Sequence, residues 1–237
     1  MGNIIKSFKQ LKWYEILMIV IMVAIAGLAV YNAIVDPTGK TPLWLAIVNF
    51  ISAIAGIVCI FFCAKANISN FIFGAVNTIT YAIYLYVSKI YGTFALEVLF
   101  YLPVNFISWY IWAKHRDEVL TEKTKSKRLT RVQNIVTTIL IVAGGLVYHM
   151  ILVRLGGEVA WLDAFTLSIG IVAVLLEMFR FKEQYVWWII TDIIAVLMYI
   201  VHFDPVYLTK KTIYLIMAVI GLINWHKLNK ERNKENE

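Results

Sequence analysis

The fold follows from apolar stretches such as Ile68–Ser88, which reads ISNFIFGAVNTITYAIYLYVS. A helix of about 20 apolar residues crosses the ~30 Å hydrocarbon layer of a membrane. Eight such stretches, joined mostly by short connections, fill this chain of 237 residues, and 61% of its residues are hydrophobic. We predict transmembrane helices at Tyr14–Val35, Trp44–Cys63, Ile68–Ser88, Tyr91–Trp112, Val132–Val153, Trp161–Phe179, Tyr185–Phe203 and Tyr207–Trp225. The sequence therefore predicts an all-α integral membrane protein with eight transmembrane helices and no soluble domain.

Basic residues predict the orientation of these helices. With a cytoplasmic N-terminus, seventeen Lys and Arg residues fall on the inner side and five on the outer side. The five outer residues are Lys40, Lys89, Arg154, Lys210 and Lys211. This bias follows the positive-inside rule, so both termini are expected in the cytoplasm. The net charge of +7 is then explained by topology and by contact with the lipid bilayer, and we expect no nucleic-acid partner.

A weak internal repeat divides the chain. Similar residues recur at offsets of 114 to 116, as in the pairs Asn77 and Asp192, Tyr84 and Tyr199, Gly56 and Gly170, and Trp109 and Trp225. The corresponding helices of the two triplets begin on the same side of the membrane, so the triplets are parallel. Parallel repeats are a known plan of membrane transporters. We predict an additional N-terminal helix (1–43), a first three-helix repeat (44–113), a loop with a linker helix (114–160), a second three-helix repeat (161–227) and a polar tail (228–237). The tail is too short and too charged to fold alone.

Polar stripes on three predicted helices carry the functional argument. The stripes contain Asn77, Tyr81 and Tyr84; Glu97, Tyr101, Asn105 and Trp109; and Trp188, Asp192 and Tyr199. An ionised carboxylate at the centre of a bilayer costs about 2.5–3.5 kcal/mol even on lenient scales, so Glu97 and Asp192 need a partner, water or a proton. A polar lumen for a ligand satisfies that need. The alternative is that these side chains only hydrogen-bond neighbouring helices and fix their packing.

The aromatic residues of the stripes narrow the class of ligand. A flat heterocycle can stack on Trp188 or Trp109 while amide and carboxylate groups bind its edge. A positively charged ring gains additional cation–π attraction. Aromatic and amide partners also suit a sugar. The sequence thus predicts a small-molecule substrate, with Asn77 and Asp192 binding it from equivalent positions of the two repeats.

Three motifs resemble those of the PnuC vitamin transporters. They are ISNFIFGAVN at Ile68–Asn77, NFISWYIW at Asn105–Trp112 and WIITD at Trp188–Asp192. The resemblance implies a three-plus-one-plus-three helical fold like that of the SWEET sugar carriers, often as a homotrimer, in the cell membrane of a bacterium. It also implies uptake of nicotinamide riboside by facilitated diffusion, followed by trapping through a cytoplasmic kinase.

Two residues depart from the family pattern. Asp192 stands where nicotinamide riboside carriers tend to have Asn, and Glu97 stands where Gln is expected. Both changes add potential negative charge to the predicted lumen. Nicotinamide riboside is cationic, but so is thiamine, and relatives are also assigned to deoxynucleosides. The sequence therefore leaves thiamine and deoxynucleosides open as alternative substrates.

Other classes of protein fit less well. The chain has no P-loop, HExxH or GxSxG motif, and no Ser or Cys neighbours a suitable His within a span. We therefore expect no enzyme, and we expect neither a metal nor another cofactor. A membrane scaffold or receptor would account for eight helices, yet it would not require polar stripes in matching halves.

Overall fold

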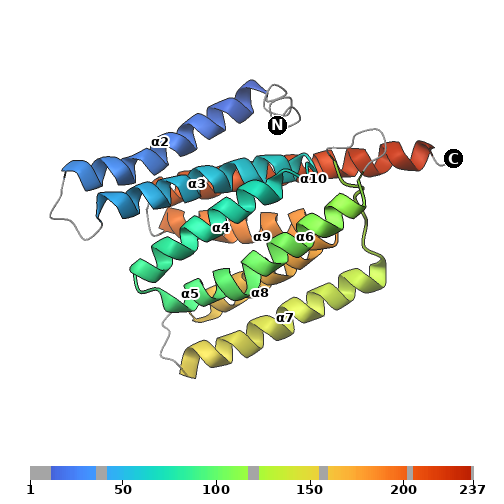
Figure 1. The fold of residues 1–237 in the computed structure, drawn as a ribbon. Coiled ribbons are helices and arrows are strands. Elements are labelled where there is room, and N and C mark those ends of the chain that lie inside the picture. The colour runs from blue at the N-terminus through green and yellow to red at the C-terminus, as the bar shows by residue number, and fades with distance from the viewer. Residues whose placement is uncertain (1–11, 36–41, 117–122, 155–159, 202–204, 236–237) are drawn as a thin grey trace. The chain divides into compact units, whose positions relative to one another are not determined.

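The computed structural model describes residues 12–35, 42–116, 123–154, 160–201 and 205–235. In chain order the elements are α2 (Trp13–Val35), α3 (Leu43–Ala64), α4 (Asn70–Val87), α5 (Tyr91–Leu96), the π-helical turn η1 (Glu97–Tyr101), α6 (Leu102–Lys114), α7 (Arg131–Arg154), α8 (Ala160–Met178), α9 (Gln184–Val201) and α10 (Pro205–Glu235) (Figure 1). Every regular element in these ranges is helical, and β-pairing is limited to isolated bridges. The expectation of an all-α protein is confirmed.

Seven helical segments of the described chain are long and apolar enough to cross a membrane. They are Trp13–Val35, Leu43–Ala64, Asn70–Val87, Tyr91–Lys114, Arg131–Ile151, Gln184–Val201 and Leu208–Leu228. Each corresponds to one of the expected spans. The eighth expected span coincides with α8, whose described apolar stretch, Ala164–Met178, is shorter.

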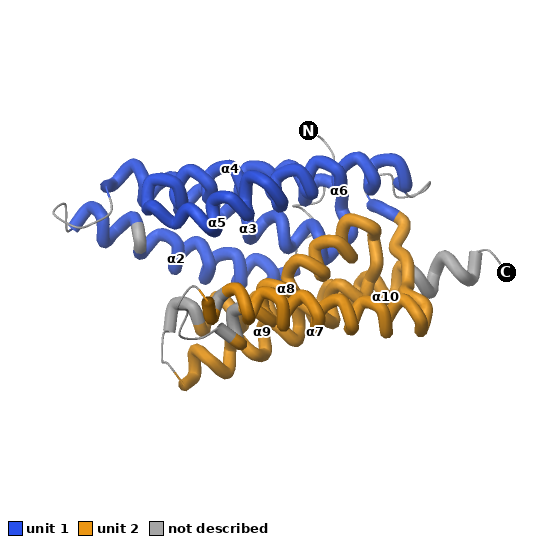
Figure 2. Tube along the Cα trace, turned by 90° about the horizontal axis from the view of Figure 1, so that it is seen from below, with its two compact units in different colours: residues 1–124 blue, residues 125–237 orange. Residues whose placement is uncertain are grey.

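The helices form two compact units, residues 1–124 (unit 1) and residues 125–237 (unit 2) (Figure 2). In unit 1, α2 packs on α3, α3 on α4, and α4 on α5, η1 and α6. In unit 2, α7 packs on α8, α8 on α9, and α9 on α10. The additional N-terminal helix thus belongs to the first unit, and the predicted linker helix belongs to the second.

The two units contain the same helix-ending turn. Asn67 donates its backbone N–H to Phe62 O at 2.9 Å, and Phe181 donates to Leu176 O at 2.8 Å. The preceding residues, Ala66 and Arg180, have φ values of 55° and 67°. A residue in this left-handed conformation ends a helix and satisfies its last carbonyl groups. Residues 66 and 180 differ by 114, and so do the first residues of the 18-residue helices α4 and α9, at 70 and 184.

A buried aromatic pair near each turn also recurs in the two units, with Phe71 and Tyr185 114 residues apart and Trp112 and Trp225 113 residues apart. The Phe71 ring lies edge-on to Trp112, with centroids 4.8 Å apart, and Tyr185 lies edge-on to Trp225 at 5.6 Å. Both tryptophans are fully buried. The expected pairing of Trp109 with Trp225 is wrong, because Trp109 is 42% exposed and Trp112 occupies the equivalent buried position.

The polar tail is not separate from the last helix. The backbone of α10 continues as one helix through residue 228 to Glu235. The short charged segment is therefore helical as an extension of α10, because an existing helix spares the segment the cost of nucleating its own first turn.

Candidate functional site

In unit 1, the Asn77 side chain lies against α3. The Ser52 hydroxyl donates a hydrogen bond of 2.8 Å to Asn77 Oδ1. A Cβ atom on Gly56 would lie 3.2 Å from the same oxygen, so the glycine leaves room for the amide. Asn77 is half-buried, and its carbonyl oxygen is held by Ser52. The Asn77 amide is thereby fixed in one orientation.

The Asn105 amide is fixed by a second glycine. A Cβ atom on Gly74 would lie only 2.4 Å from Asn105 Nδ2, so this close approach between α4 and α6 requires glycine. Asn105 Oδ1 is buried and has no hydrogen-bond partner among the described residues. A buried acceptor without a partner is costly in a protein interior. Asn105 therefore has an acceptor available for a ligand.

Glu97 lies in the π-helical turn η1. Its side chain hydrogen-bonds Thr78 of α4, and the Leu102 N–H bonds the Glu97 carbonyl. In a π-turn the backbone N–H of residue i+5 donates to the carbonyl oxygen of residue i, and such turns occur often at functional sites. The expected stripe at regular steps of four therefore does not follow one uninterrupted α-helix. Glu97, Tyr101 and Asn105 are half-buried, whereas Trp109, the fourth member, is more exposed.

Two tyrosines of α4 complete the polar cluster of unit 1. The Tyr81 and Tyr84 rings are nearly parallel, with an interplanar angle of 8° and centroids 6.2 Å apart. Both residues are half-buried. Unit 1 thus brings amides, a carboxyl group and aromatic faces onto α4 and the helices that pack against it.

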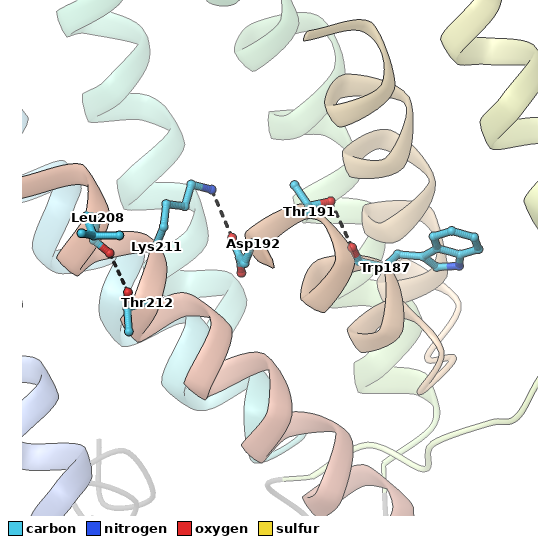
Figure 3. A network of polar contacts seen from close by, with 6 residues as sticks. All are labelled: Trp187, Thr191, Asp192, Leu208, Lys211 and Thr212. Atoms are coloured by element: carbon cyan, nitrogen blue, oxygen red, sulfur yellow. Dashed lines mark hydrogen bonds and ion pairs between the residues drawn. The ribbon is translucent and has the colours of Figure 1, made fainter. Parts of the chain in front are cut away.

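In unit 2, Asp192 pairs with a residue that sequence reasoning did not assign to the site. Lys211 Nζ of α10 donates to Asp192 Oδ1 of α9 at 3.2 Å (Figure 3). The Asp192 side chain is 6% exposed and that of Lys211 is 27% exposed. The potential negative charge expected from Asp192 is thus paired with the positive charge of Lys211. Lys211 was counted with the outer residues, but it lies inside the apolar segment Leu208–Leu228, where a lysine needs a partner as much as the carboxylate does.

The remaining predicted residues of unit 2 lie on the same helix. Trp188 and Tyr199 are half-buried on α9. The neighbouring Trp187 accepts a bond from the Thr191 hydroxyl at its backbone oxygen, and its ring points away from the ion pair (Figure 3). The structure thus places Asp192, Trp188 and Tyr199 on one helix, with Lys211 supplied by the next.

The equivalence of Asn77 and Asp192 is wrong by one residue. Because α4 and α9 correspond at an offset of 114, the counterpart of Asn77 is Thr191 and the counterpart of Asp192 is Thr78. One residue turns a helix by about 100°. Thr78 and Asp192 are both buried, and each contacts a charged side chain of a neighbouring helix, Glu97 and Lys211 respectively.

Comparison with known proteins identifies the family. A family model described as nicotinamide mononucleotide transporter matches residues 46–227. The nicotinamide riboside transporter PnuC of Neisseria mucosa is 35% identical over 199 residues, which cover 80% of this chain and 74% of that protein. The chain belongs to the PnuC family of transporters. PnuC from Haemophilus influenzae is 32% identical over 192 residues, covering 80% of this chain and 82% of the relative.

A solved PnuC structure has the same fold. The crystal structure of the vitamin B3 transporter PnuC matches with a TM-score of 0.69 and 31% identity, over 93% of this chain and 94% of that one. The chain is therefore a multi-pass membrane protein of the PnuC family, and the expectation that it is a transporter rather than an enzyme is confirmed by these relatives.

Proposed function

We propose that this chain carries nicotinamide riboside across the cell membrane of a bacterium by facilitated diffusion. The observation that carries the proposal is the sequence similarity to relatives named nicotinamide riboside transporters. The matched region, residues 46–227, includes every residue of the polar stripes. Aromatic rings beside amides and carboxyl groups suit a cationic heterocycle attached to a sugar.

We assign ligand-binding roles to ten residues. The stacking surfaces are Trp188 and Trp109, and the hydrogen-bonding and charged groups are Asn77, Asn105, Glu97, Asp192, Tyr81, Tyr84, Tyr101 and Tyr199. Support comes from the half-buried position of most of these side chains and from the free acceptor of Asn105. The exposed position of Trp109 makes Trp188 the stronger stacking candidate.

The transport mechanism forms a further part of the proposal. Eight spans, counting α8, would form an additional helix and a SWEET-like three-plus-one-plus-three core that works by alternating access. The repeated turn at residues 66 and 180 supports the two triplets. A homotrimer, cytoplasmic termini and trapping of the substrate by a cytoplasmic kinase complete this scheme.

Uptake into liposomes tests the function. Purified protein should equilibrate labelled nicotinamide riboside across the bilayer without ATP and without an ion gradient. A requirement for either would reject facilitated diffusion. No uptake, together with no thermal stabilisation by any vitamin or nucleoside, would instead favour a scaffold, because a ligand that binds the native state raises its stability.

Competition in the same liposomes tests the substrate. Excess thiamine and excess deoxynucleosides should reduce uptake of nicotinamide riboside less than unlabelled nicotinamide riboside does. Stronger competition by thiamine would assign the chain to that vitamin, which is also cationic and therefore suited to Glu97.

A further inference from the structure

Lys211 is a charged group within a membrane-spanning helix to which the proposed function gives no role. It is the fourth residue of the apolar segment Leu208–Leu228, and its Nζ lies 3.2 Å from Asp192 Oδ1. Asp192 is the ninth of the 18 residues of α9, at the middle of that helix. Solvent screens a partly buried ion pair at this position less than it screens a pair at the protein surface.

The two members of the pair differ in how far they can be reached. The Asp192 side chain is 6% exposed, whereas the Lys211 side chain is 27% exposed and ends a flexible four-carbon chain. A ligand therefore meets the Lys211 ammonium group before it meets the carboxylate. The ammonium group is also the member that can move away.

Movement of Lys211 leaves a charge that must be balanced. A carboxylate without a partner inside a membrane protein is costly. Lys211 can leave Asp192 at low cost only when another cation takes its place. The displaced ammonium has a second partner nearby, because its Nζ already lies 5.6 Å from the centroid of the Tyr214 ring.

We propose that Lys211 is a specificity-determining residue that competes with a cationic ligand for the Asp192 carboxylate. This inference rests on the proposed function for its ligand class, an aromatic ring with a fixed positive charge. Such a ring replaces the ammonium charge at Asp192 while Lys211 moves toward Tyr214. An uncharged nucleoside cannot make this exchange and leaves the ion pair intact.

Calorimetric titration of the purified protein tests the exchange. The probes are nicotinamide riboside, which is cationic, and its dihydro form, which has nearly the same shape and no charge on the ring. Lys211→Gln should bind the cation about three- to tenfold more tightly, because the competing ammonium group is gone. The affinity for the dihydro form should change less than about twofold, which is smaller than the change expected for the cation.

The neighbouring lysine provides a matched control. Lys210 Nζ also lies near the Tyr214 ring, at 5.7 Å, whereas the Asp192 carboxylate is paired with Lys211. Lys210→Gln removes the same charge from the same turn and should leave the preference for the cation over its dihydro form unchanged. Lys211→Arg keeps the positive charge and can donate two parallel N–H groups to the Asp192 carboxylate, so it should compete more strongly with the cation and lower that preference.

Each outcome bears on the proposal. Weaker or unchanged binding of nicotinamide riboside to a folded Lys211→Gln protein would reject competition, and so would equal tightening of both probes. If Lys211→Gln fails to fold, Lys211→Arg decides alone, and an unchanged preference in that variant rejects the proposal. Failure of the wild-type protein to bind either probe would reject the proposed function as well, so the two failures are distinguishable.

Discussion

Ser52 of α3 holds the Asn77 side chain of α4 in one orientation, through a hydrogen bond of 2.8 Å from its hydroxyl to Asn77 Oδ1. The Ser52 hydroxyl also lies 3.3 Å from the Asn77 backbone oxygen. Since Asn77 Oδ1 accepts from Ser52, the two N–H donors of the amide are the groups left for a ligand. This contact links the packing of α3 on α4 to the proposed binding site.

Ser52→Ala should therefore weaken substrate binding. Loss of the hydrogen bond lets the Asn77 amide rotate, and we expect affinity to fall about five- to tenfold, equivalent to roughly 1 kcal/mol. Stability should fall by a similar free energy, since Asn77 loses its partner. A binding titration and a thermal unfolding curve measure the two effects.

Ser108→Ala is the matched control. Ser108 is as buried as Ser52, but its hydroxyl donates to the backbone oxygen of Val104 on its own helix, at 2.6 Å. The control should keep its affinity for substrate. Equal losses in the two variants would show that Ser52 acts only in packing.

Gly74→Ala should destabilise the contact between α4 and α6. The added Cβ would lie 2.4 Å from Asn105 Nδ2 and 3.3 Å from Cys59 Sγ. Overpacking of this kind costs about 1–3 kcal/mol. Thermal unfolding in detergent should show a lower midpoint, and transport should fall because the Asn105 amide is displaced.

A double variant separates these two effects. Asn105→Ala removes the atom that the new Cβ would meet, so Gly74→Ala with Asn105→Ala should recover much of the lost stability. Transport should stay low if Asn105 binds the ligand. Full recovery of transport would remove Asn105 from the site.

Much of the fold could be predicted from the sequence because hydrocarbon imposes a length and a composition on every crossing helix. The apolar stretch Ile68–Ser88 contains α4, Asn70–Val87, and its polar face. The spans and the polar stripes followed from that physics alone. Family membership followed from three short motifs.

The features that the sequence did not predict correctly depend on contacts between helices and on local hydrogen bonds. Spacing along the chain shows which residues share a helix face, but it does not show that Lys211 reaches back to Asp192. The π-turn that contains Glu97 depends on a hydrogen-bond pattern that the expected period of 3.6 residues conceals. The repeat register was off by one because similar residue types at 77 and 192 suggested an offset of 115, whereas the turns at 66 and 180 fix it at 114.

Glu97→Gln should change selectivity more than stability. A glutamine carbonyl can still accept a hydrogen bond from Thr78, so we expect the free energy of unfolding to change by less than about 1 kcal/mol. Removal of the negative charge should lower affinity for nicotinamide riboside about tenfold and leave its uncharged dihydro form nearly unaffected. Titration of both ligands measures the ratio.

Thr78→Val is the companion variant. It removes the hydroxyl and keeps the Glu97 charge, so it should lower stability while keeping the preference for the cation. If Glu97→Gln lowered the affinity for both ligands equally, Glu97 would have only a packing role.

The helix-ending turns give a final contrast between two residues with the same backbone conformation. Ala66→Gly should raise stability by up to about 1 kcal/mol, because glycine adopts a positive φ without the strain of a Cβ atom. Arg180→Gly gains the same backbone relief, but it loses the hydrogen bond of 2.9 Å from Arg180 to the Lys125 oxygen and the packing of a side chain in a residue that is 3% exposed. We expect Arg180→Gly to be destabilising overall by about 1–3 kcal/mol, as for other losses of a buried polar contact.

Ala55→Gly, in the middle of α3, is the control for Ala66→Gly. It should lower stability by about 1 kcal/mol, which would show that the gain at residue 66 comes from the turn. If Ala66→Gly lowers the unfolding midpoint as much as Ala55→Gly does, the left-handed conformation at residue 66 is not a source of strain.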